Sequence, residues 1–117
     1  MNSRIARTSS QLSAPLVSVY VVNHNYGNYL PQALESVFAQ TFTDYEILLI
    51  DDGSTDGSQK IVEQYVEHEK VFPVIQQNKG LTVTNNIALR MARGKYIMRL
   101  DADDYLDPNA LMVLVAA

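Results

Sequence analysis

The stretch YEILLIDDGSTDGSQKIVE, residues 45–63, decides the fold of this chain. It begins with Tyr45 to Ile50, whose last four residues are continuously apolar, and this is typical of a strand buried on both faces of a parallel sheet. Asp51 and Asp52 follow directly, then a turn rich in Gly, Ser, Thr and Asp, and then a helical pattern. A buried strand that leads at once into a helix indicates a βαβ unit, whose parallel strands are joined by right-handed crossovers.

The same alternation recurs along the rest of the chain. Further strands are expected at residues 16–22, 71–76 and 95–100, and helices at 29–40, 59–69, 81–93 and from Pro108 onward. We place Pro73 on an edge strand and Gly94 at the C-cap of the helix before it. The sequence therefore predicts an α/β fold, Rossmann-like, with a mostly parallel sheet and helices on both faces.

The composition excludes several classes of protein. The chain has 117 residues, of which 47% are hydrophobic and 19% charged, and this balance suits one globular domain. The formal net charge is −4, and the absence of a basic block argues against a nucleic-acid partner. With no cysteine, the chain has no disulfide, no cysteine-ligated metal and no thiol catalysis. Its apolar runs are too short to span a bilayer, and we expect a cytoplasmic location.

The two ends of the chain differ from its middle. Residues 1–14 are polar and lack the apolar core of a signal peptide, so we expect a disordered leader followed by one domain over residues 15–117. The chain closes on NALMVLVAA, residues 109–117, an apolar segment without a polar finish. We therefore expect a truncated piece of a longer chain, and self-association through the exposed last helix.

Carboxylates gather where an open parallel sheet binds its ligands, beyond the carboxyl ends of the strands. The segments expected at those ends are NHNYGN (23–28), DDGSTDG (51–57), QNKG (77–80) and DADDYLD (101–107). If strand geometry continues past Leu100, Asp101 and Asp103 face the same side and can share a hard cation such as Mg²⁺. The structural alternative is an Asp-rich turn ahead of a helix, with Asp107 as its N-cap.

Other motifs fit less well. Residues 52–63 carry ligand types at EF-hand spacing, but a strand stands where an EF-hand needs a helix. An acidic pair after a strand is also similar to a phospho-receiver domain, which places that pair on its first strand. No P-loop or nucleophile elbow is present. A non-enzymatic metal-binding or receiver-like α/β module remains the alternative to an enzyme.

Taken together, these segments resemble the family-2 glycosyltransferases, which have the nucleotide-sugar-binding α/β fold called GT-A. The resemblance covers nearly all of residues 15–108 and rests on four ordered motifs: VSVYVVNHN (17–25), the segment from Leu30 to Ser58 that contains SVFAQTFTDYEILLIDDGSTDGS, NKG (78–80) and ARGKYIMRLDADDYLDP (92–108). It implies an inverting enzyme that transfers a sugar from a nucleotide-diphosphate sugar, with UDP as the expected nucleotide, to an acceptor hydroxyl. A glycan or a lipid carrier would be the acceptor, in cell-surface polysaccharide or glycolipid synthesis.

The resemblance also implies roles for single residues. The first strand-end loop would lie against the base and ribose, and the acidic pair of the second strand would accept hydrogen bonds from the base. The D-x-D pair would hold Mg²⁺ or Mn²⁺ near the donor, with Asp104 as an alternative in register. The implied donor-binding residues are Asn23, His24, Asn25, Asp51, Asp52, Asp101 and Asp103, of which the last two are the implied metal ligands.

Two departures from the family's pattern bear on these roles. Residues 22–25 read Val-Asn-His-Asn in place of the usual Pro, then Thr or Ser, then Tyr and Asn. Asn85 stands where the pattern carries Arg, which leaves Arg90, Arg93 and Arg99 as candidates for the missing positive charge. The family's catalytic base and acceptor site belong to the second half of its fold. The resemblance therefore implies no catalytic base here, donor binding without transfer, and peripheral membrane contact only in the full-length protein.

Overall fold

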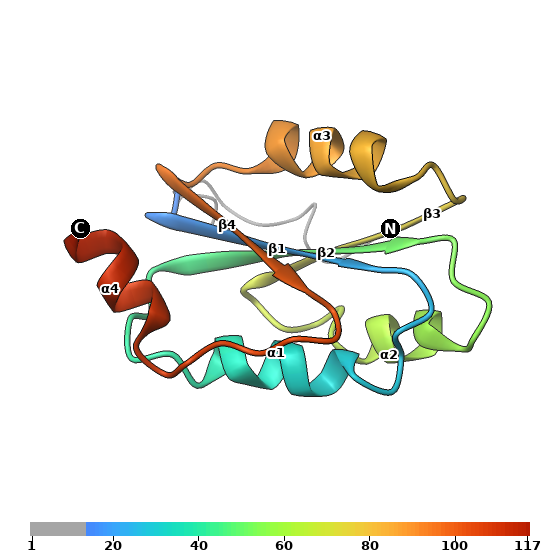
Figure 1. The fold of residues 1–117 in the computed structure, drawn as a ribbon, viewed down its shortest axis with the longest axis horizontal. Coiled ribbons are helices and arrows are strands. Elements are labelled where there is room, and N and C mark those ends of the chain that lie inside the picture. Colours follow the sequence, from blue (N-terminus) through green and yellow to red (C-terminus); the bar gives the residue numbers. More distant parts are fainter. Residues whose placement is uncertain (1–13) are drawn as a thin grey trace.

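The computed structural model describes residues 14–117, which form a four-stranded sheet with helices on both faces (Figure 1). The strands are β1 (Val17–Asn23), β2 (Tyr45–Asp52), β3 (Val71–Gln76) and β4 (Tyr96–Asp101). The helices are α1 (Leu30–Phe38), α2 (Ser58–Gln64), α3 (Leu81–Met91) and α4 (Ala110–Ala116). The α/β class expected from the sequence is confirmed. The expected leader lies outside the described residues, apart from Ala14.

The sheet is parallel throughout, and its strand order is β3-β2-β1-β4. The chain moves outward from β1 to β2 and β3, and then crosses back to place β4 on the other side of β1. Figure 1 shows the result, with α1 and α2 on one face and α3 on the other. The direction of winding reverses between β1 and β4, so the connections diverge there and leave a crevice at the carboxyl ends of those two strands.

Alternating side chains of the strands divide the core into two layers. Val17, Val19 and Val21 of β1 point toward the layer shared with α1, where helical spacing buries one stripe of side chains. Tyr20 of β1 points to the other layer, against Ala88 of α3. Both faces of β1 and β2 are therefore covered, which explains their nearly continuous apolar runs.

Several expected boundaries are confirmed, but two helices differ: α2 is shorter than expected, and α4 begins at Ala110 with Asn109, and not Asp107, as its N-cap. Pro73 lies on β3, an edge strand, as the missing N–H predicts. The helix expected over residues 59–69 ends at Gln64. Tyr65 leaves helical geometry there (φ −103°, ψ 2°), and its ring packs against Phe38 with 5.9 Å between centroids. Within residues 14–117, no helix is long and apolar enough to cross a bilayer.

Gly94 does not cap α3, and that expectation is wrong. The helix ends at Met91, and its C-cap residue Ala92 has extended backbone (φ −63°, ψ 131°). Gly94 instead lies against β1, where an added Cβ would stand 2.5 Å from the Ser18 nitrogen. The Gly94 N–H donates to Ser18 Oγ at 2.8 Å. The connection from α3 to β4 therefore needs glycine for close approach to a neighbouring strand.

A buried ion pair fixes the same connection to the amino ends of the strands. Glu46 of β2 is 2% exposed and accepts hydrogen bonds from Ser18 Oγ (2.6 Å), Arg93 N–H (2.9 Å) and Arg93 Nε (3.0 Å). A buried carboxylate needs such partners, because removal of its solvent is costly. Arg93 is therefore bound to Glu46 at the amino ends of the strands, away from the carboxyl ends.

Candidate functional site

A cavity of about 320 Å³ lies at the crevice between β1 and β4. Residues from the end of β1, the start of α3 and the end of β4 line it: Val22, His24, Tyr26, Leu81, Arg99, Asp101, Ala102 and Asp103. Three chain segments that are far apart in the sequence thus meet where the winding of the sheet reverses. This is where an open α/β sheet binds its ligands.

Asp101 and Asp103 both line this cavity and are both exposed. β4 ends at Asp101, so the strand expected to continue past Leu100 stops there, and the turn that follows buries Ala102 (2% exposed) and brings both carboxylates to the cavity. Asp104 does not line the cavity. Its N–H donates to the Asp101 carbonyl (3.0 Å), and its Oδ1 accepts from Tyr105 N–H (2.8 Å), which closes the turn after β4.

His24 lines the cavity, and its ring is held by the backbone at the end of β2. Its Nδ1 is 2.7 Å from the Asp52 carbonyl oxygen. A carbonyl oxygen only accepts, so Nδ1 is the donor in this contact. Asn78 Nδ2 donates to the same carbonyl at 3.2 Å, which holds the loop after β3 beside the ring.

Asp52 is 3% exposed, and its carboxylate holds the start of α3. Oδ1 accepts from Lys79 N–H (2.8 Å) and Gln76 Nε2 (3.0 Å), and Oδ2 accepts from Gly80 N–H (3.2 Å). Burial raises the pKa of the Asp52 carboxyl, but the hydrogen bonds and the nearby His24 outweigh it, so the net pKa lies below the ordinary 3.8. Asp52 is therefore a carboxylate held in its charged form by the backbone that it orders.

Asp51 and Asn23 lie beneath the loops and are fully buried. Asp51 Oδ1 accepts from Asn23 Nδ2 (2.9 Å) and Ser54 Oγ (2.7 Å), and Oδ2 accepts from Ser54 N–H (3.0 Å). Asn23 Oδ1 is buried without a partner among the described residues. Both carboxylate oxygens of Asp51 are thus used to join the loops after β1 and β2.

Asn25 joins the same two loops on the exposed side. Its backbone is left-handed (φ 63°), a conformation that asparagine tolerates better than most residues. Its N–H donates to Ser54 Oγ (3.0 Å), and its Oδ1 accepts from Thr55 N–H (2.7 Å). Asn25 therefore braces the loop after β1.

Three residues of this arrangement were missed at the level of sequence. The sequence places Ser54 only in a turn, yet its buried hydroxyl connects Asn23, Asn25 and Asp51. Gln76 and Asn78 hold the loop after β3 to Asp52. The sequence did offer a signal, because both stand at the carboxyl end of a strand.

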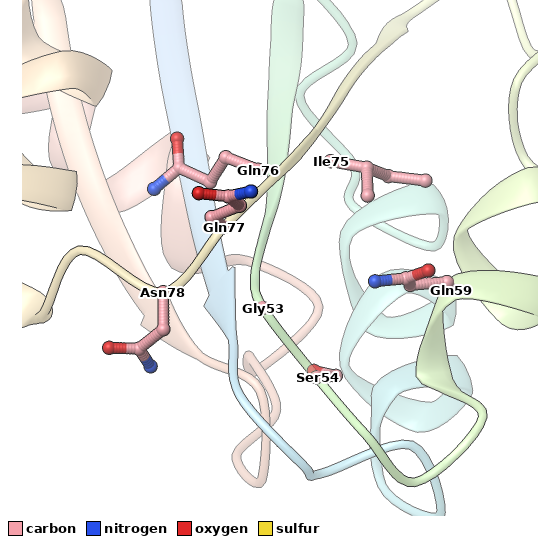
Figure 2. A pocket seen from close by; sticks show the side chains of 7 residues that line it. All are labelled: Gly53, Ser54, Gln59, Ile75, Gln76, Gln77 and Asn78. Atoms are coloured by element: carbon pink, nitrogen blue, oxygen red, sulfur yellow. The ribbon is translucent and has the colours of Figure 1, made fainter.

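A second cavity, of about 460 Å³, lies farther along the same edge of the sheet. Figure 2 shows it between the loop after β2 and the end of β3, with Gln59 reaching toward it from α2. Its lining residues are Gly53, Ser54, Gln59, Ile75, Gln76, Gln77 and Asn78. The cavity is lined by carboxamides and has no charged side chain, so it offers no carboxylate to a cation.

The first cavity suits a divalent ion that is shared with a substrate. Mg²⁺ and Mn²⁺ prefer oxygen ligands, and Asp101 and Asp103 present carboxylates to one space. Among residues 14–117, no group of three or more His, Cys, Asp or Glu side chains is placed to hold a metal. The protein would thus supply two ligands, and a bound phosphate and water would complete the coordination.

The three arginines that could supply the positive charge missing at Asn85 lie in different places. Arg93 is bound to Glu46 at the other edge, Arg90 lies in the last turn of α3, and Arg99 lines the cavity. Asn85 itself lies on α3, and its Oδ1 is buried without a partner among the described residues. Arg99 is therefore the arginine of the three that reaches the candidate site.

Comparisons with known proteins identify similar chains. A family model described as "Glycosyl transferase family 2" matches residues 18–117. A chondroitin synthase from Escherichia coli is 44% identical over 98 residues, which are 83% of this chain and 14% of that protein.

Solved structures are similar in fold as well. TarS of S. aureus in complex with UDP-GlcNAc matches with a TM-score of 0.73 and 31% identity, over 86% of this chain and 30% of that one. The mannosyltransferase PcManGT from Pyrobaculum calidifontis, in complex with GDP-Man and Mn²⁺, matches with a TM-score of 0.75 and 25% identity, over 90% of this chain and 32% of that one. This chain thus spans less than a third of the length of each of these three relatives.

Proposed function

The chain belongs to glycosyltransferase family 2, and on that premise we propose that its cavity between β1 and β4 binds a nucleotide-diphosphate sugar as donor. The sugar would pass to an acceptor hydroxyl by single displacement with inversion. One observation carries the proposal: Asp101 and Asp103 are exposed to the same cavity that His24 and the start of α3 complete. UDP is the proposed nucleotide, supported by the UDP-GlcNAc complex of similar TarS.

We divide the donor-binding residues by what they can reach. His24, Asp101 and Asp103 line the cavity and would contact the donor directly. The ring of His24, oriented by the Asp52 carbonyl, would lie against the nucleoside. The D-x-D pair would lie at the diphosphate.

The remaining donor-site residues would act by position. Asn23, Asp51 and Asn25 hold the loops after β1 and β2 together, and Asp52 fixes the backbone at the start of α3. For Asp52, which the resemblance assigns to the base, contact with the donor would run through its Oδ2, which accepts one hydrogen bond among the described residues. These residues would keep the cavity in one shape before the donor arrives.

Asp101 and Asp103 are the residues proposed to hold Mg²⁺ or Mn²⁺. When bound, such an ion supplies positive charge at the diphosphate, which is the leaving group of the transfer. The Mn²⁺ complex of similar PcManGT supports a divalent metal.

The acceptor and the transfer step are proposed for the longer protein. A glycan or a lipid carrier is the proposed acceptor, and the cytoplasm, with peripheral contact at the inner face of the membrane, the proposed location. The catalytic base is proposed to lie outside this chain, which we expect to bind donor without transferring sugar. Sugar transfer to an acceptor by this chain alone would contradict that expectation.

Calorimetric titration of UDP into the protein, with and without Mn²⁺, tests the proposed function. We expect binding that needs Mn²⁺ and is lost in Asp103→Ala. Asp104→Ala is the matched control, because this neighbouring carboxylate is exposed but does not line the cavity. Equal loss of UDP affinity in both variants, or a UDP affinity that is the same with and without Mn²⁺, would contradict the assignment of the D-x-D pair.

A further inference from the structure

We propose that Arg99 is an exchangeable cation of the donor cavity. It pairs with Asp101 while the cavity is empty, and it turns to the diphosphate of the donor when a divalent ion takes that carboxylate. This inference rests on the proposed function of the cavity and adds a residue that recognises the charged part of the donor.

The geometry of the pair fits exchange. Arg99 Nε and Nη2 each lie 2.9 Å from the same oxygen, Oδ1 of Asp101. The Arg99 side chain is 42% exposed and the Asp101 side chain 55% exposed, so water competes for both groups. Exposed ion pairs of this kind contribute little to stability and are readily broken. The ion pair thus positions the Arg99 side chain but is weak enough to be replaced by another contact.

The charge around the cavity gives Arg99 its role. Of the described residues that line the cavity, Arg99 alone carries a permanent positive charge, against the two carboxylates of Asp101 and Asp103. A divalent ion on those carboxylates cancels their charge and leaves the guanidinium in excess. A diphosphate would then meet a positively charged cavity, and the planar fork of Arg suits phosphate oxygens.

Arg99 and a divalent ion compete for the same Asp101 oxygen. Arg99 therefore opposes metal binding when no nucleotide is present, and it favours nucleotide binding when the metal is present. Metal and nucleotide then strengthen each other's binding, since each removes an obstacle to the other. A residue with a purely structural role would not affect the two ligands in opposite directions.

The test measures Mn²⁺ alone, UDP at saturating Mn²⁺, and uridine as a probe without phosphate, each by calorimetric titration. For Arg99→Gln we expect Mn²⁺ affinity to rise about twofold to fivefold, the small value of an exposed ion pair. UDP affinity should fall about tenfold, the value of one charge-assisted hydrogen bond. Uridine affinity should stay unchanged.

Two further variants separate charge from position. Arg90→Gln makes the same change of net charge on α3, away from the cavity lining, and should shift neither affinity. Arg99→Lys keeps the charge but loses the fork, so its UDP affinity should fall between those of the wild type and Arg99→Gln. Because Arg99 is exposed, thermal denaturation should show that every variant folds.

The outcomes distinguish this inference from the proposed function. If the wild type binds UDP with Mn²⁺ and Arg99→Gln binds both ligands unchanged, the exchange is overturned and the donor site stands. If the variant loses affinity for both ligands together, Arg99 has only a structural role and the inference again fails. If the wild type binds no UDP in any condition, the proposed function fails and takes the inference with it.

Discussion

Replacing Asp52 with asparagine is expected to loosen the start of α3 and to lower the free energy of unfolding by about 2 kcal/mol at pH 7. The carboxylate accepts three hydrogen bonds, two at Oδ1 and one at Oδ2. Asparagine keeps an acceptor at the first position but places a donor opposite Gly80 N–H. The variant therefore loses one hydrogen bond to a charged acceptor, worth about 1.5–3 kcal/mol, and weakens the other two.

Urea denaturation followed by circular dichroism measures this change. For a domain near this size, a loss of about 2 kcal/mol lowers the melting temperature by roughly 8–16 °C. Asp103→Asn is the matched control, since this carboxylate is exposed and should shift stability by less than about 0.5 kcal/mol. Our reasoning is refuted if Asp52→Asn is as stable as the control.

The pH dependence of the unfolding free energy gives a second test of the same variant. The pKa of Asp52 in the folded chain lies below the ordinary 3.8. Its stabilising contribution is therefore present above pH 3.8 and is lost as pH falls through the folded pKa. The stability difference between wild type and Asp52→Asn should shrink below pH 3.8, whereas a difference independent of pH would contradict the charged hydrogen bonds.

Three further predictions follow from packing. Gly94→Ala places a Cβ 2.5 Å from the Ser18 nitrogen and should lower the unfolding free energy by about 2 kcal/mol in urea, whereas an unchanged midpoint would contradict the close approach. Asn85→Leu removes a buried acceptor without a partner among the described residues, so it should raise the unfolding free energy by about 1 kcal/mol in the same assay. A lower unfolding free energy would contradict this and show that Oδ1 has a partner. We also propose self-association through α4, where Met112 is 44% and Val113 67% exposed, so Val113→Glu should reduce the mass in light scattering; a monomeric wild type would contradict it.

The order of strands and helices could be predicted because local patterns decide it. Residues 47–50 are apolar without interruption, and this run lies in the buried strand β2. The position of Asp101 and Asp103 at the carboxyl end of a strand could also be predicted from the parallel sheet, but it is a turn after Asp101, and not strand alternation, that brings both to one cavity.

What could not be predicted depends on contacts between distant segments. Gly94 looked like a helix cap because glycine after a helix usually is one, and only the approach of β1 shows its other cause. Asp51 and Asp52 look alike in the sequence, yet alternation sends their side chains to opposite faces of the sheet. Asp51 is then enclosed with Ser54, whereas Asp52 holds the backbone before α3.

The loops around the donor cavity are held by their own side chains. Asn23, Asp51 and Ser54 form a buried hydrogen-bonded group that joins the loops after β1 and β2. These bonds hold the loop that carries His24 of the cavity lining, so a donor would lose little conformational entropy in ordering that loop. The rate of association would then be governed by diffusion and by the charge at the cavity mouth, and not by a slow rearrangement of the chain.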